Sequence, residues 1–245
     1  MNRTCRVASA LVLALVLAPS AFADEAAIRK NISERVPNFP KIDEITKSAI
    51  PGLYELRVME TEIFYTDEQG NYLIQGGQLI DTKTRANLTE ERIAKLTAID
   101  FKALPLKDAM VWKQGSGERK LVVFADPNCG YCKRFEKDLQ AVKDVTVYTF
   151  LYPILGGDSP EKSKQIWCAK DNTKAWRDWM LKGTAVTDSP QCDTSALQRN
   201  FAFGQKHHIR GTPGLVFEDG RQQAGAMNTE QIEKQLVATR QKVPG

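Results

Sequence analysis

The sequence Cys129-Gly130-Tyr131-Cys132 constrains the fold of this chain more than any other feature, because of the segments on either side of it. Residues 121–125 form an apolar run without polar alternation, which predicts a strand buried on both faces. Apolar residues recur with helical spacing after Cys132, and residues 145–151 predict a further strand. The paired cysteines are therefore expected at the strand-to-helix junction of a βαβ unit.

Two cysteines at this spacing suit thiol–disulfide exchange for a geometric reason. If Cys129 occupies the first turn of the helix, its sulfur lies beside unsatisfied backbone N–H groups and the positive end of the helix dipole, which favour the thiolate. Cys132 then lies one turn further along on the same face. The first sulfur can attack a foreign disulfide, and the second can break the resulting mixed disulfide. We therefore predict that Cys129 and Cys132 are the catalytic, redox-active pair.

The same pair of cysteines has two other interpretations, a zinc half-site and a haem attachment site. Haem attachment requires a histidine after the second cysteine, whereas Lys133 follows Cys132 here. Zinc requires two further ligands at suitable spacing. The strand-then-helix context favours redox chemistry, and we predict no metal site.

The first 23 residues have the pattern of a secretory signal. Arg3 and Arg6 give a positive start, residues 7–18 are apolar, and Ala21-Phe22-Ala23 matches a cleavage site, so we expect cleavage after Ala23 and export to the periplasm. The apolar stretch is shorter than the ~20 residues of a membrane span. Loss of the two arginines lowers the formal charge from +4 to +2, which gives no support for nucleic acid as a partner.

Four cysteines remain after the signal, which allows three disulfide pairings. Cys129 and Cys132 form the local pair, which leaves Cys168 with Cys192. In an oxidising compartment this second pair is expected to form a structural bridge, worth roughly 3 to 4 kcal/mol by loop entropy. A second catalytic pair is the alternative.

The N-terminal region, residues 24–85, has the pattern of a small β-meander. Residues 25–36 predict an amphipathic helix, and residues 53–58, 62–66 and 72–74 have strand character with turn residues between them. A region of this size has a small core, and a short open sheet leaves its edges exposed. Association with a second copy or packing against the rest of the chain would cover those edges, and the sequence does not distinguish the two.

A linker helix and a second domain follow this region. Residues 86–104 form the predicted linker, with a helical apolar stripe over 91–99, and the second domain covers 105–245. Residues 158–203 read as a helical insert. It contains the tryptophans Trp167, Trp176 and Trp179, which are expected to pack in a core rather than to contact substrate.

The motifs of the second domain resemble those of the thioredoxin superfamily. They are the CxxC sequence after a buried strand, the helical insert, and Gly211-Thr212-Pro213 about eighty residues later, just before another strand. With the signal, the N-terminal sheet and the linker helix, the whole mature chain resembles the DsbC family of bacterial periplasmic disulfide isomerases. The resemblance implies an α+β fold with a small cystatin-like N-terminal dimerisation domain, a linker helix and a C-terminal thioredoxin-like α/β domain.

The resemblance also implies partners. It predicts a homodimer that holds misfolded exported proteins as clients, chaperone activity, and the membrane reductase DsbD as electron donor. It implies no cofactor.

Near the reactive pair, the resemblance implies roles for four further residues. Gly130, Tyr131, Thr212 and Pro213 are expected to form the active-site loops that contact the client, with the peptide bond before Pro213 in the cis form. The chain departs from thioredoxin six residues before Cys129, where Val123 replaces a buried acid, so the proton acceptor for Cys132 is not identified.

Isomerisation of client disulfides, through a mixed disulfide with Cys129, is the predicted function. One alternative is a thiol:disulfide oxidase or reductase with the same fold. The other is a chaperone-type binding protein whose cysteines are incidental.

Overall fold

A computed structural model describes residues 20–187 and 189–240 of the chain, which divides into two compact units after Thr89. Of the predicted signal segment, residues 1–19 lie outside the described part, and residues 20–23 are the first residues of a helix. Within the described ranges, no helix combines the length and the apolar character needed to span a membrane.

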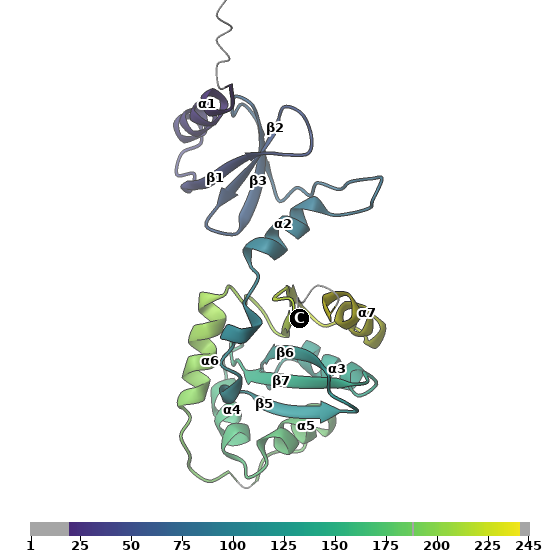
Figure 1. The fold of residues 1–245 in the computed structure, drawn as a ribbon. Helices are drawn as coiled ribbons and strands as arrows, with labels where there is room; N and C mark the ends of the chain where they lie inside the picture. Colours follow the sequence, from purple (N-terminus) through teal and green to yellow (C-terminus); the bar gives the residue numbers. More distant parts are fainter. Residues whose placement is uncertain (1–19, 188, 241–245) are drawn as a thin grey trace, which may run out of the picture. The chain divides into compact units, whose positions relative to one another are not determined.

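The N-terminal unit is a helix packed against an antiparallel meander, as the sequence predicts (Figure 1). The sheet has the order β1-β2-β3-β4. Its core brings the buried side chains of Ile28 and Ile32 from the helix against Leu56, Val58 and Phe64 from the sheet. The elements are α1 (Ser20–Arg35), β1 (Ile42–Lys47), β2 (Leu53–Val58), β3 (Glu62–Asp67) and β4 (Leu73–Gln75).

Strand β1 is the element of this sheet that the sequence did not predict. Its apolar residues Ile42 and Ile45 are three positions apart, which is helical rather than strand spacing. The pairing of β1 with β2 shifts register between Ile42 and Glu44, as in a β-bulge. The bulge breaks the alternation of faces, so both isoleucines pack into the same core.

The C-terminal unit contains a five-stranded mixed sheet in the order β5-β7-β6-β8-β9. The central strand β6 pairs in parallel with β7 and antiparallel with β8, and the predicted βαβ unit is β6-α3-β7. The predicted linker, residues 86–104, contains α2 (Leu88–Leu96) and η1 (Phe101–Ala103), and η2 (Leu106–Asp108) follows it. The strands are β5 (Met110–Gln114), β6 (Arg119–Ala125), β7 (Val145–Leu151), β8 (Gly214–Phe217) and β9 (Gln222–Ala224).

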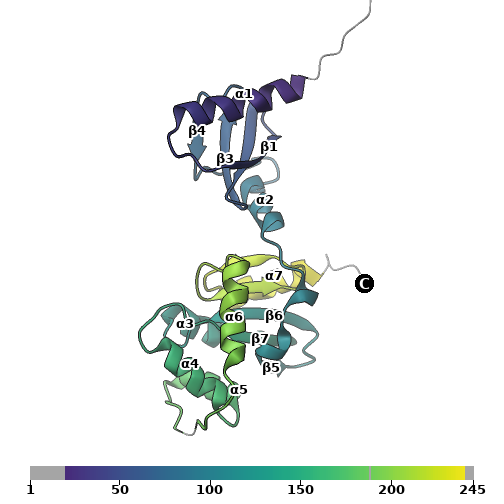
Figure 2. The same ribbon diagram turned by 90° about the vertical axis from the view of Figure 1, so that its left-hand side faces the viewer.

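Both faces of this sheet are covered, which confirms the interpretation of the apolar run. Leu121, Val123 and Ala125 of β6 belong to one buried cluster with residues of α3 and α7. Val122 and Phe124 point to the opposite side, where Phe203 of α6 stacks on Phe124 with ring centroids 6.1 Å apart. Figure 2 shows α6 crossing the sheet. The helices are α3 (Gly130–Leu139), α4 (Ser159–Cys168), α5 (Asn172–Lys182), α6 (Ser195–Lys206) and α7 (Thr229–Arg240).

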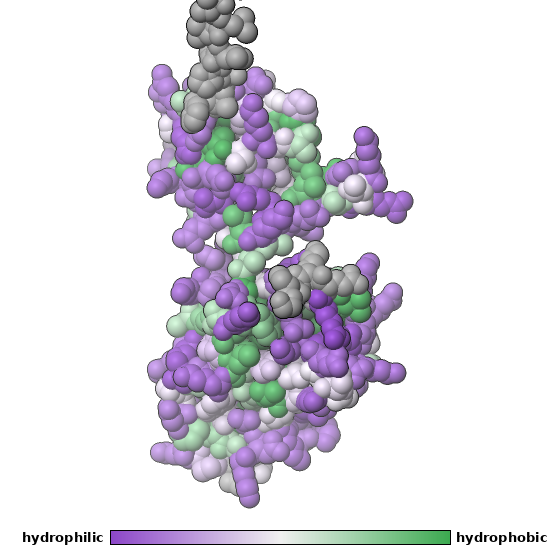
Figure 3. Space-filling model, in the orientation of Figure 1, coloured by the Kyte–Doolittle hydropathy of each residue, from purple (hydrophilic) through white to green (hydrophobic). Residues whose placement is uncertain are grey.

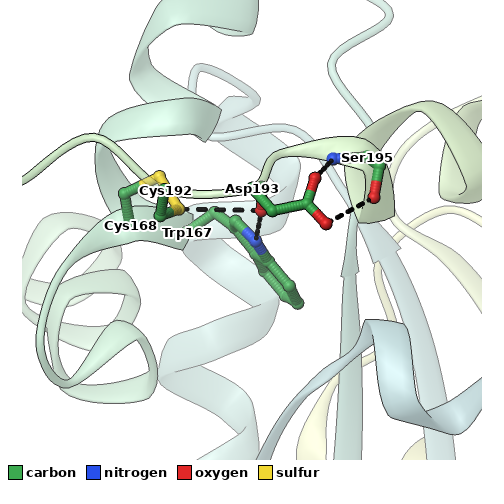
Figure 4. The surroundings of a disulfide bond; sticks show 5 residues. All are labelled: Trp167, Cys168, Cys192, Asp193 and Ser195. Carbon is green, nitrogen blue, oxygen red and sulfur yellow. Dashed lines mark hydrogen bonds between the residues drawn. A yellow bond between two sulfur atoms is a disulfide. The ribbon is translucent and has the colours of Figure 1, made fainter.

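Helices α4 and α5 and most of α6 lie in the predicted insert, and a disulfide ties the end of α4 to the segment before α6. It joins Cys168, the last residue of α4, to Cys192, with 5.5 Å between the Cα atoms (Figure 4). Beside it the Trp167 indole donates a hydrogen bond to the carbonyl oxygen of Asp193 at 3.0 Å, and the Asp193 carboxylate accepts hydrogen bonds from Ser195. These contacts hold the residues before α6 against the end of α4.

Candidate redox site

Cys129 lies between the end of β6 and the start of α3. It is the N-cap of α3, with extended backbone angles of −71° and 115°, and its sulfur accepts a hydrogen bond from the N–H of Cys132 at 3.4 Å. A capping position is where backbone donors of a helix lack partners, so the sulfur takes the place of the usual capping oxygen. This is the position that the sequence predicts.

The loop before β8 faces Cys129 from the far end of the chain. The peptide bond between Thr212 and Pro213 is cis, and the sulfur of Cys129 lies 3.2 Å from the Thr212 carbonyl oxygen, to which it donates a hydrogen bond only when it is protonated. The carbonyl oxygen of Pro213 is fixed by the N–H of Gly225 at 2.9 Å. The fold therefore brings Cys129, Cys132, Thr212 and Pro213 into one site.

The two thiols of this site differ in their acidity. The pKa of Cys129 is lowered to about 5, chiefly because it accepts a hydrogen bond from the Cys132 thiol and further ones from backbone N–H groups, which outweigh its desolvation. The pKa of Cys132 is raised, first by burial and then by the hydrogen bond it gives to Cys129. The exposed fractions are 5 % for Cys129 and 1 % for Cys132. At neutral pH one sulfur is an anion and the other is a buried thiol.

The two residues between the cysteines lie at the surface of the site. Gly130 is the first residue of α3, and Tyr131 is 68 % exposed. Tyr131 and Thr212 line a pocket of about 260 Å³ beside the cysteines. A phenol ring at this edge offers a large apolar face to an incoming chain.

Asp126 anchors the turn between β6 and Cys129, a role that the sequence did not predict. Its carboxylate is fully buried and accepts hydrogen bonds from the N–H of Asn128 at 2.8 Å, the hydroxyl of Ser159 at 2.8 Å and the N–H of Leu155 at 3.0 Å. A buried carboxylate requires such partners. The turn is therefore held to α4 and to the segment before it.

Trp179 of the insert packs over the same turn. Its indole donates a hydrogen bond to the Pro127 carbonyl oxygen at 2.6 Å. The ammonium groups of Lys133 and Lys162 lie 4.6 Å and 4.2 Å from its ring centroid. These cation–π contacts link α3 and α4 to α5. The three tryptophans contact protein side chains and backbone, as the packing interpretation predicts.

Glu136 is a second buried carboxylate, on α3 one turn after Cys132. It is 1 % exposed, and its Oε1 accepts a hydrogen bond from the Trp176 indole at 2.6 Å. Within the described ranges, its Oε2 is without a hydrogen-bond partner. Burial raises its pKa to about 7, against the opposing effects of Trp176 and Arg177.

Replacing Glu136 by glutamine is expected to remove a pH-dependent loss of stability. Below pH 4.5 the carboxyl is protonated in the folded and unfolded states, and between pH 4.5 and about 7 the unfolded state releases its proton first, so stability falls as pH rises. The total is about 3 kcal/mol. Urea unfolding of the parent and of Glu136→Gln at pH 5 and pH 8 measures this difference. The free energy of unfolding of Glu136→Gln should exceed that of the parent mainly at pH 8.

An exposed carboxylate on α4 provides the control for this measurement. Glu161→Gln removes a side chain whose exposed fraction is 64 %, so its stability relative to the parent should not depend on pH. An equal gap between Glu136→Gln and the parent at both pH values would contradict the expectation.

A cysteine pair at the strand-to-helix junction of a βαβ unit defines a thioredoxin-like redox site. The described residues contain no group of three or more His, Cys, Asp or Glu side chains that could hold a metal ion. The family models agree with this class. Residues 106–240 match the thioredoxin-like domain, and residues 19–90 match the disulfide bond isomerase protein N-terminal domain.

Curated relatives match both units. The probable thiol:disulfide interchange protein DsbC of Bordetella pertussis is 38 % identical over 223 residues, which cover 89 % of this chain and 76 % of the relative. The thiol:disulfide interchange protein DsbC of Salmonella typhimurium is 28 % identical and covers 85 % of each chain. A crystal structure of a disulfide interchange protein from Neisseria gonorrhoeae matches with a TM-score of 0.54 and 37 % identity, covering 56 % of this chain and 99 % of that one. The chain belongs to the DsbC family of thiol:disulfide interchange proteins.

Proposed function

We propose that the protein is a disulfide isomerase that reshuffles non-native disulfides through a mixed disulfide with Cys129. The asymmetry between the two thiols carries this proposal, because Cys129 is ionised at neutral pH while Cys132 keeps its proton. Because Cys129 is ionised, it can attack a client disulfide at once. Because Cys132 is protonated, it breaks the mixed disulfide slowly, so a client thiol has time to attack first. The relatives named as thiol:disulfide interchange proteins support the same activity.

The isomerisation proceeds without net transfer of electrons. The Cys129 thiolate attacks one sulfur of a client disulfide, which forms the mixed disulfide and releases a client thiolate. A client thiolate then attacks the client sulfur of that mixed disulfide, which forms a new client disulfide and returns Cys129 to the thiolate. Client and enzyme keep their oxidation states, so this cycle needs no cofactor.

A second path consumes electrons and explains the need for a reductase. If no client thiol attacks, Cys132 loses its proton and displaces the client from Cys129, so that the client is reduced and the enzyme pair is oxidised. The oxidised pair must be reduced again before isomerisation resumes. We assign this step to the membrane reductase DsbD. The protein is proposed to act in the periplasm, after export and cleavage of its signal after Ala23.

The active-site loops are proposed to hold the client as an extended strand. Within 20–187 and 189–240, the Thr212 N–H forms no hydrogen bond, so it is available to a client backbone carbonyl. Tyr131 is exposed beside the same site. Gly130, Tyr131, Thr212 and Pro213 would then contact the residues next to the client cysteine.

The N-terminal unit is proposed to form a homodimer, which would also provide a surface for misfolded clients and so chaperone activity. Its last strand, β4, is a three-residue edge, and Tyr72, Ile74 and Ile80 are large apolar side chains exposed on or near it. Figure 3 shows apolar side chains at the surface of this unit. Pairing with a second copy would cover this edge and its apolar residues.

The test of the proposed function is the recovery of a scrambled multi-disulfide protein under a fixed thiol buffer. The mature protein in catalytic amounts is expected to accelerate recovery, and the double variant Cys129→Ala, Cys132→Ala is expected to add nothing beyond its effect on aggregation. Equal acceleration by the double variant would leave only a chaperone. Mass in solution tests the dimer separately.

An oxidase is the second candidate, and the low pKa of Cys129 favours it. A stable thiolate stabilises the reduced pair and makes the disulfide form a readier donor. Rapid donation of the enzyme disulfide to reduced clients, without recovery of scrambled ones, would identify an oxidase.

A further inference from the structure

The pocket beside Cys129 has a composition suited to a negatively charged group. It measures about 260 Å³ and is built from three segments, the start of α3, the loop before β8, and residues 225–231, which run from the end of β9 into α7. Its lining residues are Tyr131, Arg134, Thr212, Gly225, Ala226, Met227, Asn228 and Gln231. Arg134 is the single charged residue among these eight.

The Arg134 guanidinium is an unused donor at this pocket. Within the described ranges it has no hydrogen bond or ion pair, and the residue is exposed. Two charged residues on the same helices are engaged elsewhere, since Lys133 lies over Trp179 and Glu233 of α7 pairs with Arg119 at 2.5 Å. A free guanidinium presents a planar set of N–H donors that matches a carboxylate.

The two amide side chains of the pocket also present donors. The Asn228 side-chain oxygen accepts from the N–H of Gln231 at 2.9 Å, and the Gln231 side-chain oxygen accepts from the N–H of Asn228 at 3.0 Å. Because the atom that accepts in each of these reciprocal bonds must be the amide oxygen, the NH2 group of each side chain remains available as a donor. In the part of the chain that the structure describes, neither NH2 group has a partner.

The apolar part of the lining fits the stem of a side chain. Ala226 and Met227 are partly buried and pack against the main core, and the Pro213–Gly225 hydrogen bond holds this segment beside the cis-proline loop. A glutamate or aspartate side chain combines a short apolar stem with a carboxylate. Because Tyr131 and Thr212 line the pocket and also flank Cys129, a side chain within two residues of the reacting client cysteine can reach it.

We propose that this pocket binds the carboxylate of an acidic side chain that lies next to the reacting cysteine of a client. The inference rests on the proposed function, since it names the clients that the redox site prefers. Arg134 supplies the charge, and the amide groups of Asn228 and Gln231 supply further donors. Clients with glutamate or aspartate beside a mispaired cysteine are then attacked faster than their neutral counterparts.

Short peptides with one cysteine, held as a disulfide with a small neutral thiol, test the preference. Each peptide is acetylated and amidated and carries glutamate, glutamine or lysine one or two residues from the cysteine. At low ionic strength the mature protein is expected to react with the glutamate peptide about tenfold faster than with the glutamine peptide at one of these positions. The measured quantity is the ratio of rate constants, in which any change of Cys129 ionisation cancels.

Arg134→Gln is expected to bring this ratio close to one. The matched control is Lys137→Gln, which removes an exposed positive charge from the same helix outside the pocket and should keep the ratio near tenfold. A tenfold ratio that survives Arg134→Gln, or that falls equally in Lys137→Gln, would overturn the proposal.

A further comparison, between a peptide with an internal glutamate and one with a free C-terminal carboxylate, distinguishes recognition of a side-chain carboxylate from recognition of a chain end. If the preference appears only with a free C-terminal carboxylate, and not with an internal glutamate, the side-chain assignment is wrong. Failure of this inference is distinguishable from failure of the proposed function, because recovery of scrambled proteins is measured independently of the peptide ratios.

Discussion

At pH 5, Cys129 of the reduced protein is expected to react with an uncharged alkylating agent at about half of its maximal rate. The thiolate is the reactive form, and the pKa of Cys129 is lowered to about 5 from the ordinary value of 9.0, first by the hydrogen bond from Cys132. A thiol with the ordinary pKa would retain only about one ten-thousandth of its maximal rate at pH 5. The expected effect is therefore several thousandfold.

The measurement is the rate of iodoacetamide modification from pH 4 to pH 9, followed by mass spectrometry at Cys129. Each rate is divided by the plateau value of the same protein, so limited access to a buried sulfur cancels. Reduced glutathione gives the pH profile of a thiol with an ordinary pKa. The Cys129→Ala variant shows whether Cys132 contributes to the measured modification rate. A half-maximal rate at pH 8 or above would remove the ionised sulfur on which the mechanism depends.

The position of the reactive pair could be predicted because the information is local. An apolar run, a break and a helical apolar stripe follow one another within 25 residues, and they define β6 and α3 with Cys129 between them. The sequence could likewise locate the meander, since residues 53–58 and 62–66 have strand character with turn residues between them. Strand β1 was not predicted because its bulge breaks the alternation of apolar and polar residues on which a strand prediction depends.

The surroundings of the pair could not be predicted in the same way. Val123 lies in the core where thioredoxin has a buried acid, but two other acids are buried nearby, Asp126 in the turn and Glu136 on α3. Their burial depends on Ser159 and Trp176, which come from the insert. A charged residue is normally exposed, so only tertiary contacts reveal such exceptions. The one available signal for Glu136 was its place four residues after Cys132.

The pocket at Arg134 depends even more on distant segments. Its walls come from residues 131–134, Thr212 and residues 225–231, and no local pattern joins these. The insert was predicted as a packing unit, which agrees with the contacts of Trp176 and Trp179. What the sequence did not indicate is that these tryptophans hydrogen-bond the active-site helix and the turn before it.

Cys129→Ala and Cys132→Ser are expected to separate the roles of the two sulfurs in the isomerisation of a scrambled client. In Cys129→Ala, the remaining thiol is 1 % exposed and has a raised pKa, so less than about 1 % of it is ionised at pH 7. Catalysed recovery should fall by at least about 100-fold. In Cys132→Ser, the hydroxyl can still donate a hydrogen bond to the Cys129 thiolate, so attack continues while the resolving sulfur is absent.

The distinguishing observation is therefore covalent. Cys132→Ser should accumulate the mixed disulfide between Cys129 and the client, visible by mass spectrometry after acid quenching, whereas the parent should show little and Cys129→Ala none. The reason is that release in Cys132→Ser depends only on a client thiol, because the enzyme can no longer break the bond by itself. A Cys129→Ala protein that keeps a tenth or more of the parent rate would mean that Cys132 is the nucleophile, contrary to its burial and its raised pKa.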